Sequence, residues 1–212
     1  NLNNKIRANI IRTFDINKTN TKIAKLNGGV LGGSIIEGVL KIGDYIQILP
    51  GRVIKIDNKW IVKPLYSTVT SIYSDKNKME YAIPGGLIGI GTKLDPSLCK
   101  SDNLIGQIIT YPDDNIPIAS IINVKYTTIK RDGEKIKLHT KQQIKIGLGS
   151  IIVRGIIKDK NSKDKLIKIE LESPLCMHNN NVTIIVKNDS KNYKIAGIGE
   201  IIDYKIVDKV LY

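Results

Sequence analysis

The sequence predicts an all-β protein made of two consecutive small β-barrels, and three features support this prediction. Apolar and polar residues alternate with a period of two, as in YIQIL at 45–49 and VTIIV at 182–186. Gly, Asn, Asp and Pro interrupt these runs at short intervals, which is typical of barrels and sandwiches. No segment carries a sustained apolar stripe at helical spacing, so long helices are not expected.

The elements follow from the same patterns, taken in chain order. Gly43-Asp44 predicts a turn before the first alternating strand, and SLCKSDNLIG at 97–106 predicts a single helical turn. Further strands are expected around 144–146, 166–171 and 182–186. The lysine-rich KDKNSKDK at 158–165 is expected to be a hairpin tip.

A domain boundary is predicted at YPDDNIP, residues 111–117. Its two prolines, two aspartates and one asparagine break the strand pattern on both sides. We therefore expect one barrel over residues 1–114 and a second over 115–212, each of a size that suits a small closed sheet.

Composition narrows the functional classes. No apolar run reaches the length of about 18 residues that crosses a membrane, and the first residues do not resemble a signal peptide. Cys99 and Cys176 are far apart in the sequence and are expected to be buried free thiols. Neither they nor His139 and His178 form a cluster with metal-ligand spacing, so no metal site is expected.

The net charge of +13 indicates an anionic partner, for which nucleic acid is the usual identity. The excess comes mainly from lysine, and Asn and Ile are also abundant, as A/T-rich codons would produce. Charge alone therefore leaves two interpretations open: RNA binding, or lysines that merely cover solvated faces.

The stretch PGGLIGIGTKLDP at 84–96 contains the glycines, lysine and hydroxyl of a phosphate-binding loop, but in the wrong order. Its glycines lie inside an apolar run, and Pro96 disfavours a helix directly before it. Glycines within a strand instead mark a bend, a bulge or the close approach of a ligand. The same alternatives apply to LNGGVLGGSIIEGVLKIGDYIQILPG at 26–51, and no set of catalytic residues is evident.

The runs IIRTFDINK at 10–18, LNGGVLGGSIIEGVLKIGDYIQILPG and YAIPGGLIGIGTKLDPSLCKSDNLIGQII at 81–109 resemble the gamma subunit of eukaryotic and archaeal translation initiation factor 2. GLGSIIVRGII, SPLCMH and YKIAGIGEI extend the resemblance, more thinly, through the second half, and the cysteine positions are more similar to eukaryotic members.

The resemblance implies the second and third domains of that subunit, two barrels as in elongation factor Tu. The GTP-binding domain, with its GTP and Mg²⁺, is expected to be absent from these residues, so this chain would hold no cofactor and would not be an enzyme. A cytoplasmic location, without membrane contact, is implied as well.

The resemblance also implies a clamp for the 3′ end of initiator methionyl-tRNA, half of it on the first barrel. The candidate tRNA-binding residues lie in the two glycine-rich stretches and beside them: Arg12, Gly28, Gly29, Val30, Gly32, Gly33, Ile83, Gly85, Gly86 and Lys93. The glycines would admit RNA to the main chain, Val30 and Ile83 would face the terminal base, and Arg12 and Lys93 would meet phosphate. Packing of the barrel itself is the competing explanation for each glycine.

Further partners implied by the family are the alpha subunit, the beta subunit through the GTP-binding domain, the small ribosomal subunit, and an assembly chaperone on the third domain. Arg52 and Trp60, in the expected long hairpin tip at 50–63, are candidates for the alpha-subunit interface. Trp60 serves either there or as a cover for the barrel mouth. The alternatives are a fragment of a Tu-like or selenocysteine-specific elongation factor, or a protein-interaction scaffold for factor assembly.

The chain departs from the family in the second half. YTTIKRDGEKIKLHT at 126–140 is shorter and more polar than the usual stretch, and Tyr193-Lys194 replaces the usual Trp-Arg. These differences weaken any transfer of third-domain partner surfaces from relatives.

Overall fold

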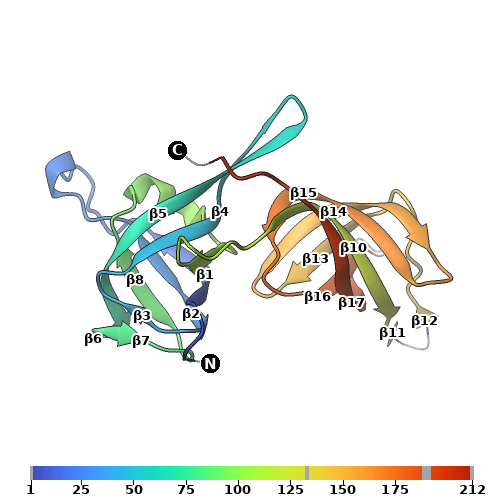
Figure 1. Ribbon diagram of the computed structural model, residues 1–212, viewed down its shortest axis with the longest axis horizontal. Coiled ribbons are helices and arrows are strands. Elements are labelled where there is room, and N and C mark those ends of the chain that lie inside the picture. Colours follow the sequence, from blue (N-terminus) through green and yellow to red (C-terminus); the bar gives the residue numbers. More distant parts are fainter. Residues whose placement is uncertain (1, 132–133, 188–191, 211–212) are drawn as a thin grey trace. The chain divides into compact units, whose positions relative to one another are not determined.

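The computed structural model describes residues 2–131, 134–187 and 192–210, and every long element in it is a β-strand (Figure 1). The described residues form two compact units. The first contains the residues up to Arg52 and Lys63–Asn115, and the second contains Val53–Val62 and Ile116–Val210. The prediction of an all-β chain with two barrels is confirmed.

The first unit is a ring of six strands. The strands of this unit are β1 (Arg7–Phe14), β2 (Val30–Glu37), β3 (Leu40–Lys41), β4 (Tyr45–Ile56), β5 (Lys59–Ser74), β6 (Asn77–Met79), β7 (Tyr81–Ala82), β8 (Ile88–Thr92) and β9 (Ile108–Thr110). The parts of β4 and β5 within Val53–Val62 are grouped with the second unit. The sheet order is β4-β9-β1-β2-β8-β5, and the pairing of β4 with β5 closes the ring. β6 adds to β5, and β3 pairs with β7 in a separate two-stranded sheet.

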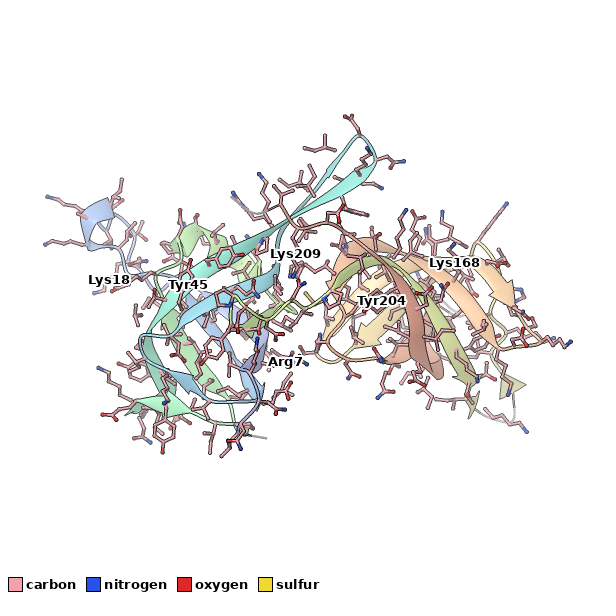
Figure 2. All side chains as sticks on the ribbon, viewed as in Figure 1. Arg7, Lys18, Tyr45, Lys168, Tyr204 and Lys209 are labelled. Carbon is pink, nitrogen blue, oxygen red and sulfur yellow. The ribbon has the colours of Figure 1, made fainter. Side chains whose placement is uncertain are left out.

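Alternation along the strands fills this barrel. Leu31, Ile46 and Ile72 are fully buried, whereas Tyr45 (labelled in Figure 2) beside Ile46 and Tyr73 beside Ile72 are exposed. Each buried isoleucine or leucine contributes about 1.5–3 kcal/mol of burial free energy, so the inward face stabilises the ring. Two 3₁₀ helices, η1 (Ile23–Lys25) and η2 (Pro96–Asp102), lie between strands, and η2 confirms the helical turn expected near residue 97.

The long hairpin tip expected at 50–63 is a hairpin whose strands form a regular ribbon almost to its end. β4 and β5 run directly into a two-residue turn at Asp57 and Asn58, whose φ angles are 46° and 63°. Both values match a type I′ turn, and its twist suits a two-stranded ribbon. The expected hairpin is therefore present, and its strands continue further than expected because KIDNK contains a tight-turn signal.

The second unit contains a closed six-stranded antiparallel barrel, in the order β10-β15-β14-β13-β16-β17. The strands of this unit are β10 (Ile118–Thr128), β11 (Lys130–Arg131), β12 (Glu134–Lys135), β13 (Gln143–Leu148), β14 (Ile151–Asn161), β15 (Leu166–Cys176), β16 (Asn181–Lys187) and β17 (Tyr193–Ile206). The ring closes where β10 pairs with β17. The turn between β14 and β15 falls inside 158–165, which confirms that hairpin tip.

The core of the second barrel is again aliphatic. Ile146, Ile169 and Ile184 are fully buried and belong to one cluster. β11 and β12 form a small separate ribbon within the polar stretch 126–140, of which residues 132–133 lie outside the described part. Among the described residues, no helix is long and apolar enough to cross a membrane.

Both cysteines are buried free thiols, as expected. Burial raises the pKa of the Cys99 thiol to about 11, with a further contribution from the Asp15 and Asp95 carboxylates. Burial raises the pKa of the Cys176 thiol to about 12. Since the thiolate is the reactive form, both thiols are protonated and shielded at neutral pH.

We therefore expect iodoacetamide at pH 8 to leave both cysteines unmodified in the folded chain and to alkylate both in guanidinium chloride, as read by mass spectrometry. The unfolded sample is the control for reagent quality. Complete labelling of either thiol in the folded chain within the time that unfolded chain needs would contradict this burial.

Candidate nucleic-acid interface

A row of four residues crosses the outside of the first barrel. Arg12 in β1 pairs with Gly32 in β2, Gly32 pairs with Gly89 in β8, and Gly89 pairs with Tyr73 in β5. Arg12 and Tyr73 are exposed, so two large side chains flank two adjacent glycines. We call these four residues the glycine row.

Phe14 extends the surface beside Arg12. The Phe14 ring is 41% exposed, and the Arg12 guanidinium carbon lies 5.7 Å from its centroid. A Cβ atom on Gly32 would lie 3.3 Å from Phe14 Cε2, so the ring leans towards the bare backbone of Gly32. An aromatic face and a guanidinium therefore adjoin the glycines on the β1 side.

Asp102 positions the end of β1. Its Oδ1 accepts hydrogen bonds from Arg12 Nε at 3.2 Å and from Thr13 N at 2.8 Å. The bond to Arg12 uses one of the five N–H donors of a guanidinium. Arg12 is thus oriented by the protein while its exposed group retains donors suited to a phosphate.

A second acidic group lies just beyond β1. Asp15 accepts the backbone N–H of Asn17 at 3.0 Å, which is the main cause of a lowered pKa for its carboxyl. Lys100 Nζ lies 3.6 Å from Asp15 Oδ2 and lowers this pKa further. The carboxylate is therefore ionised at neutral pH and holds this loop beside η2.

Three of the predicted glycines are required by packing. A Cβ atom would overlap the Thr92 carbonyl oxygen at Gly28, the Cys99 sulfur at Gly29, and the Asn9 carbonyl oxygen at Gly33. These contacts lie within the barrel, so barrel packing explains these positions without RNA.

At positions 85 and 86 the backbone conformation, rather than packing, explains the presence of glycine. Their φ angles are +120° and +68°, a region that L side chains rarely adopt. They form the turn before β8, next to the exposed Ile83.

The structure separates residues that the sequence grouped together. Ile83, Gly85 and Gly86 precede β8, whereas the exposed Lys93 follows it. Five residues of extended strand span about 17 Å. Val30, by contrast, pairs with Phe14 and Gly91 and lies directly beside the glycine row.

Gly89 was not among the predicted site residues, yet it is the most informative glycine. No protein atom lies within 4 Å of a Cβ built on it, and its backbone is not in the left-handed region. Glycine inside a strand costs about 0.5–1 kcal/mol relative to alanine. Since neither packing nor backbone geometry requires it, Gly89 is a candidate position for the close approach of another molecule to the main chain.

Phe14 and Tyr73, like Gly89, are absent from the candidate residues predicted from the sequence. The signal for Gly89 was the period-two spacing of glycines in GLIGIG, which places Gly89 and Gly91 on one strand face. No comparable signal existed for Tyr73, because its position beside Gly89 depends on the pairing of β5 with β8.

The two predicted interface residues lie on the β4–β5 ribbon. Arg52 is exposed, and Trp60 is half-buried with Lys55 Nζ 5.0 Å from its ring centroid. Trp60 belongs to neither of the two aliphatic core clusters of the described residues.

Comparison with known proteins identifies the class first. Residues 28–110 match the model of elongation factor Tu domain 2, and residues 120–201 match "Initiation factor eIF2 gamma, C terminal". Two structures of translation elongation factor SelB from Methanococcus maripaludis, one apo and one with the GTP analogue GppNHp, cover 97% of this chain, each with a TM-score of 0.70 and 19% identity. The chain covers 45% and 44% of them, respectively, and this likeness concerns the fold. The two units are translation-factor β-barrels.

The sequence relationship is more specific. Eukaryotic translation initiation factor 2 subunit 3 of Drosophila melanogaster is 35% identical over 214 residues, or 95% of this chain. The chain spans 45% of that relative's length. It belongs to the family of the gamma subunit of translation initiation factor 2, as the sequence motifs predicted.

The two kinds of glycine are expected to respond differently to alanine. Gly33→Ala forces a Cβ into the Asn9 carbonyl and should lower the free energy of unfolding by about 1–3 kcal/mol. Gly89→Ala meets open space and should leave it unchanged or raise it by up to about 1 kcal/mol. Urea denaturation of both variants measures the difference, and equal losses would contradict the distinction.

Proposed function

We propose that the first barrel forms half of a binding site for the 3′ end of initiator methionyl-tRNA. The single observation that carries this proposal is the glycine row, in which the open backbone at Gly89 lies between Tyr73 and Gly32, with Arg12 beyond. Family membership supports translation initiation as the setting.

Each part of the row has a role in the proposal. Arg12 contacts a phosphate, while Phe14 and Tyr73 present aromatic faces on which bases of a single-stranded end stack. Val30 adds apolar surface at the same edge. At Gly89 the absence of a side chain lets ribose or phosphate reach the strand itself.

The overall charge is in keeping with an RNA partner. A net charge of +13 attracts polyanions and makes association dependent on salt. Lys93 and the Ile83–Gly86 turn lie at opposite ends of β8, so we propose that they contact different parts of the acceptor end.

Other partners are proposed from family membership. The β4–β5 ribbon, with Arg52 and Trp60, is the proposed contact for the alpha subunit, because an exposed ribbon with an aromatic residue suits a protein interface. The small ribosomal subunit and an assembly chaperone are proposed partners of the assembled factor. We assign GTP, Mg²⁺ and the beta subunit to polypeptide outside the two barrels, and no catalytic role to the barrels themselves.

The alternatives differ in their RNA preference. A Tu-like or selenocysteine-specific elongation factor would favour elongator tRNA, and a scaffold would bind proteins without tRNA. The 35% identity to an initiation factor favours the first proposal over an elongation factor.

Fluorescence anisotropy with labelled initiator tRNA tests the proposal on the 212-residue chain. Gly89→Val should weaken binding roughly tenfold, equivalent to about 1.4 kcal/mol, by blocking the approach to β8. Arg12→Ala should weaken binding and reduce the slope of log affinity against log salt by about 1.

The matched control for Arg12→Ala is Arg154→Ala, another exposed arginine with a carboxylate partner, Glu172, at 3.7 Å. A tRNA trimmed of its 3′ CCA should bind wild type and Gly89→Val alike. The proposal is wrong if Gly89→Val is neutral with intact tRNA, or if trimming leaves the effect of the variant unchanged.

A further inference from the structure

A second bare stretch of sheet lies on the outside of the second barrel. Ile152 in β14 pairs with Gly147 in β13, Gly147 pairs with Thr183 in β16, and Thr183 pairs with Ile198 in β17. Ile152 and Ile198 are 62% and 55% exposed, and the row lies in a depression of about 750 Å³. We call this depression, with Gly147 and Thr183 as its floor and the two isoleucines as its walls, the isoleucine groove.

Neither packing nor backbone conformation within the barrel explains why residue 147 is glycine. A Cβ there would make ordinary contact with Thr183 Cβ at 3.6 Å, and its backbone is not in the left-handed region. Other strand glycines of this barrel differ, because a Cβ on Gly155, Gly197 or Gly199 would overlap neighbouring atoms. Gly147 thus keeps the floor low although a larger residue would fit, which leaves room there for a ligand.

The walls suit aliphatic side chains. Three strand spacings separate Ile152 from Ile198, a distance of about 14 Å. Ile185, which also lines the groove, extends the apolar surface along β16. Burying the two exposed isoleucines against a partner would favour association, whereas leaving them in water would not.

A positively charged cluster adjoins one end of the groove. In the row next to the floor, Lys145 pairs with Ile185. Lys145 Nζ lies 3.6 Å and Lys187 Nζ 6.0 Å from the ring centroid of Tyr193. Two ammonium groups held near one ring repel each other, and a carboxylate from outside would relieve that repulsion.

We propose that the isoleucine groove binds a polypeptide segment that places aliphatic side chains between Ile152 and Ile198 and an acidic residue beside Lys145 and Lys187. The positive charges of Lys145 and Lys187 favour an acidic residue at that end, whereas the lining of the groove itself carries one lysine, Lys125, and one glutamate, Glu200. Nucleic acid is disfavoured, because the described lining of the groove contains no aromatic side chain and Lys145 Nζ already lies over the ring of Tyr193 at its end. This interaction is separate from tRNA binding and belongs to the other barrel.

Anisotropy with a synthetic fluorescent peptide tests this proposal. The peptide alternates Leu with Ser and ends in several Asp residues; one control peptide carries Lys in place of Asp, and another carries Ser in place of Leu. The acidic apolar peptide should bind the 212-residue chain at least about tenfold more tightly than either control.

Three variants then locate the site. Gly147→Val should fill the floor of the groove, retain the melting temperature of wild type, and weaken peptide binding by about tenfold. Ile198→Asp should weaken it similarly, and Lys145→Glu should do so only for the acidic peptide. Ile202→Asp is the matched control, because Ile202 is 52% exposed on the same strand but outside the groove lining, and it should be neutral.

Binding lost in Gly147→Val and Ile198→Asp but kept in Ile202→Asp supports the proposal. It is overturned if the peptide does not bind, if all variants bind alike, or if a short single-stranded RNA binds more tightly and loses affinity with Lys145→Glu. Should Gly147→Val be unstable, Ile198→Asp and Ile202→Asp still decide the question.

Discussion

The register of β2 between β1 and β8 is the constraint on which the first barrel and its candidate site both depend. Leu31, Gly33 and Ile35 point inward, and Val30 and Gly32 point outward. A shift of one residue would exchange the two faces, exposing Leu31 and burying the site. Packing against Asn9 enforces this register, because only a residue without a side chain fits at Gly33. The core contact and the outer row are therefore specified together.

The space around each glycine separates two uses of glycine in both barrels. Glycines whose missing side chain is occupied by neighbouring protein atoms, such as Gly28 and Gly197, serve the fold. Gly89 and Gly147 have no such neighbour at clashing distance and no unusual backbone conformation. Nothing within the protein therefore compensates for the stability that a strand loses when it contains glycine. Both lie on outward faces next to exposed side chains. This pattern supports two separate surfaces for two kinds of partner, one flanked by aromatic rings and the other by isoleucines.

Much of the fold was predictable because alternation with a period of two reports local geometry directly. Strands, the 3₁₀ turn near residue 97 and the tip between β14 and β15 follow from neighbouring residues alone. The site was less predictable, because it depends on pairing across strands. Gly28, Gly29 and Gly33 are candidate RNA-facing positions in the sequence, and the structure supplies a packing reason for each of them. Gly89 and Tyr73 join the candidate site only through the pairing of β5 with β8. The hairpin at 50–63 follows from the sequence, but the length of its strands does not, because it depends on the tight turn at Asp57-Asn58.

We propose the binding of an RNA end on the outward-facing backbone of β2 and β8. Its most direct test is a ¹H–¹⁵N NMR titration of the chain with an acceptor minihelix that ends in CCA. We expect the largest amide shifts at Arg12, Phe14, Gly32, Gly89 and Tyr73. Large shifts confined to other residues of the first barrel, with these five unchanged, would contradict it.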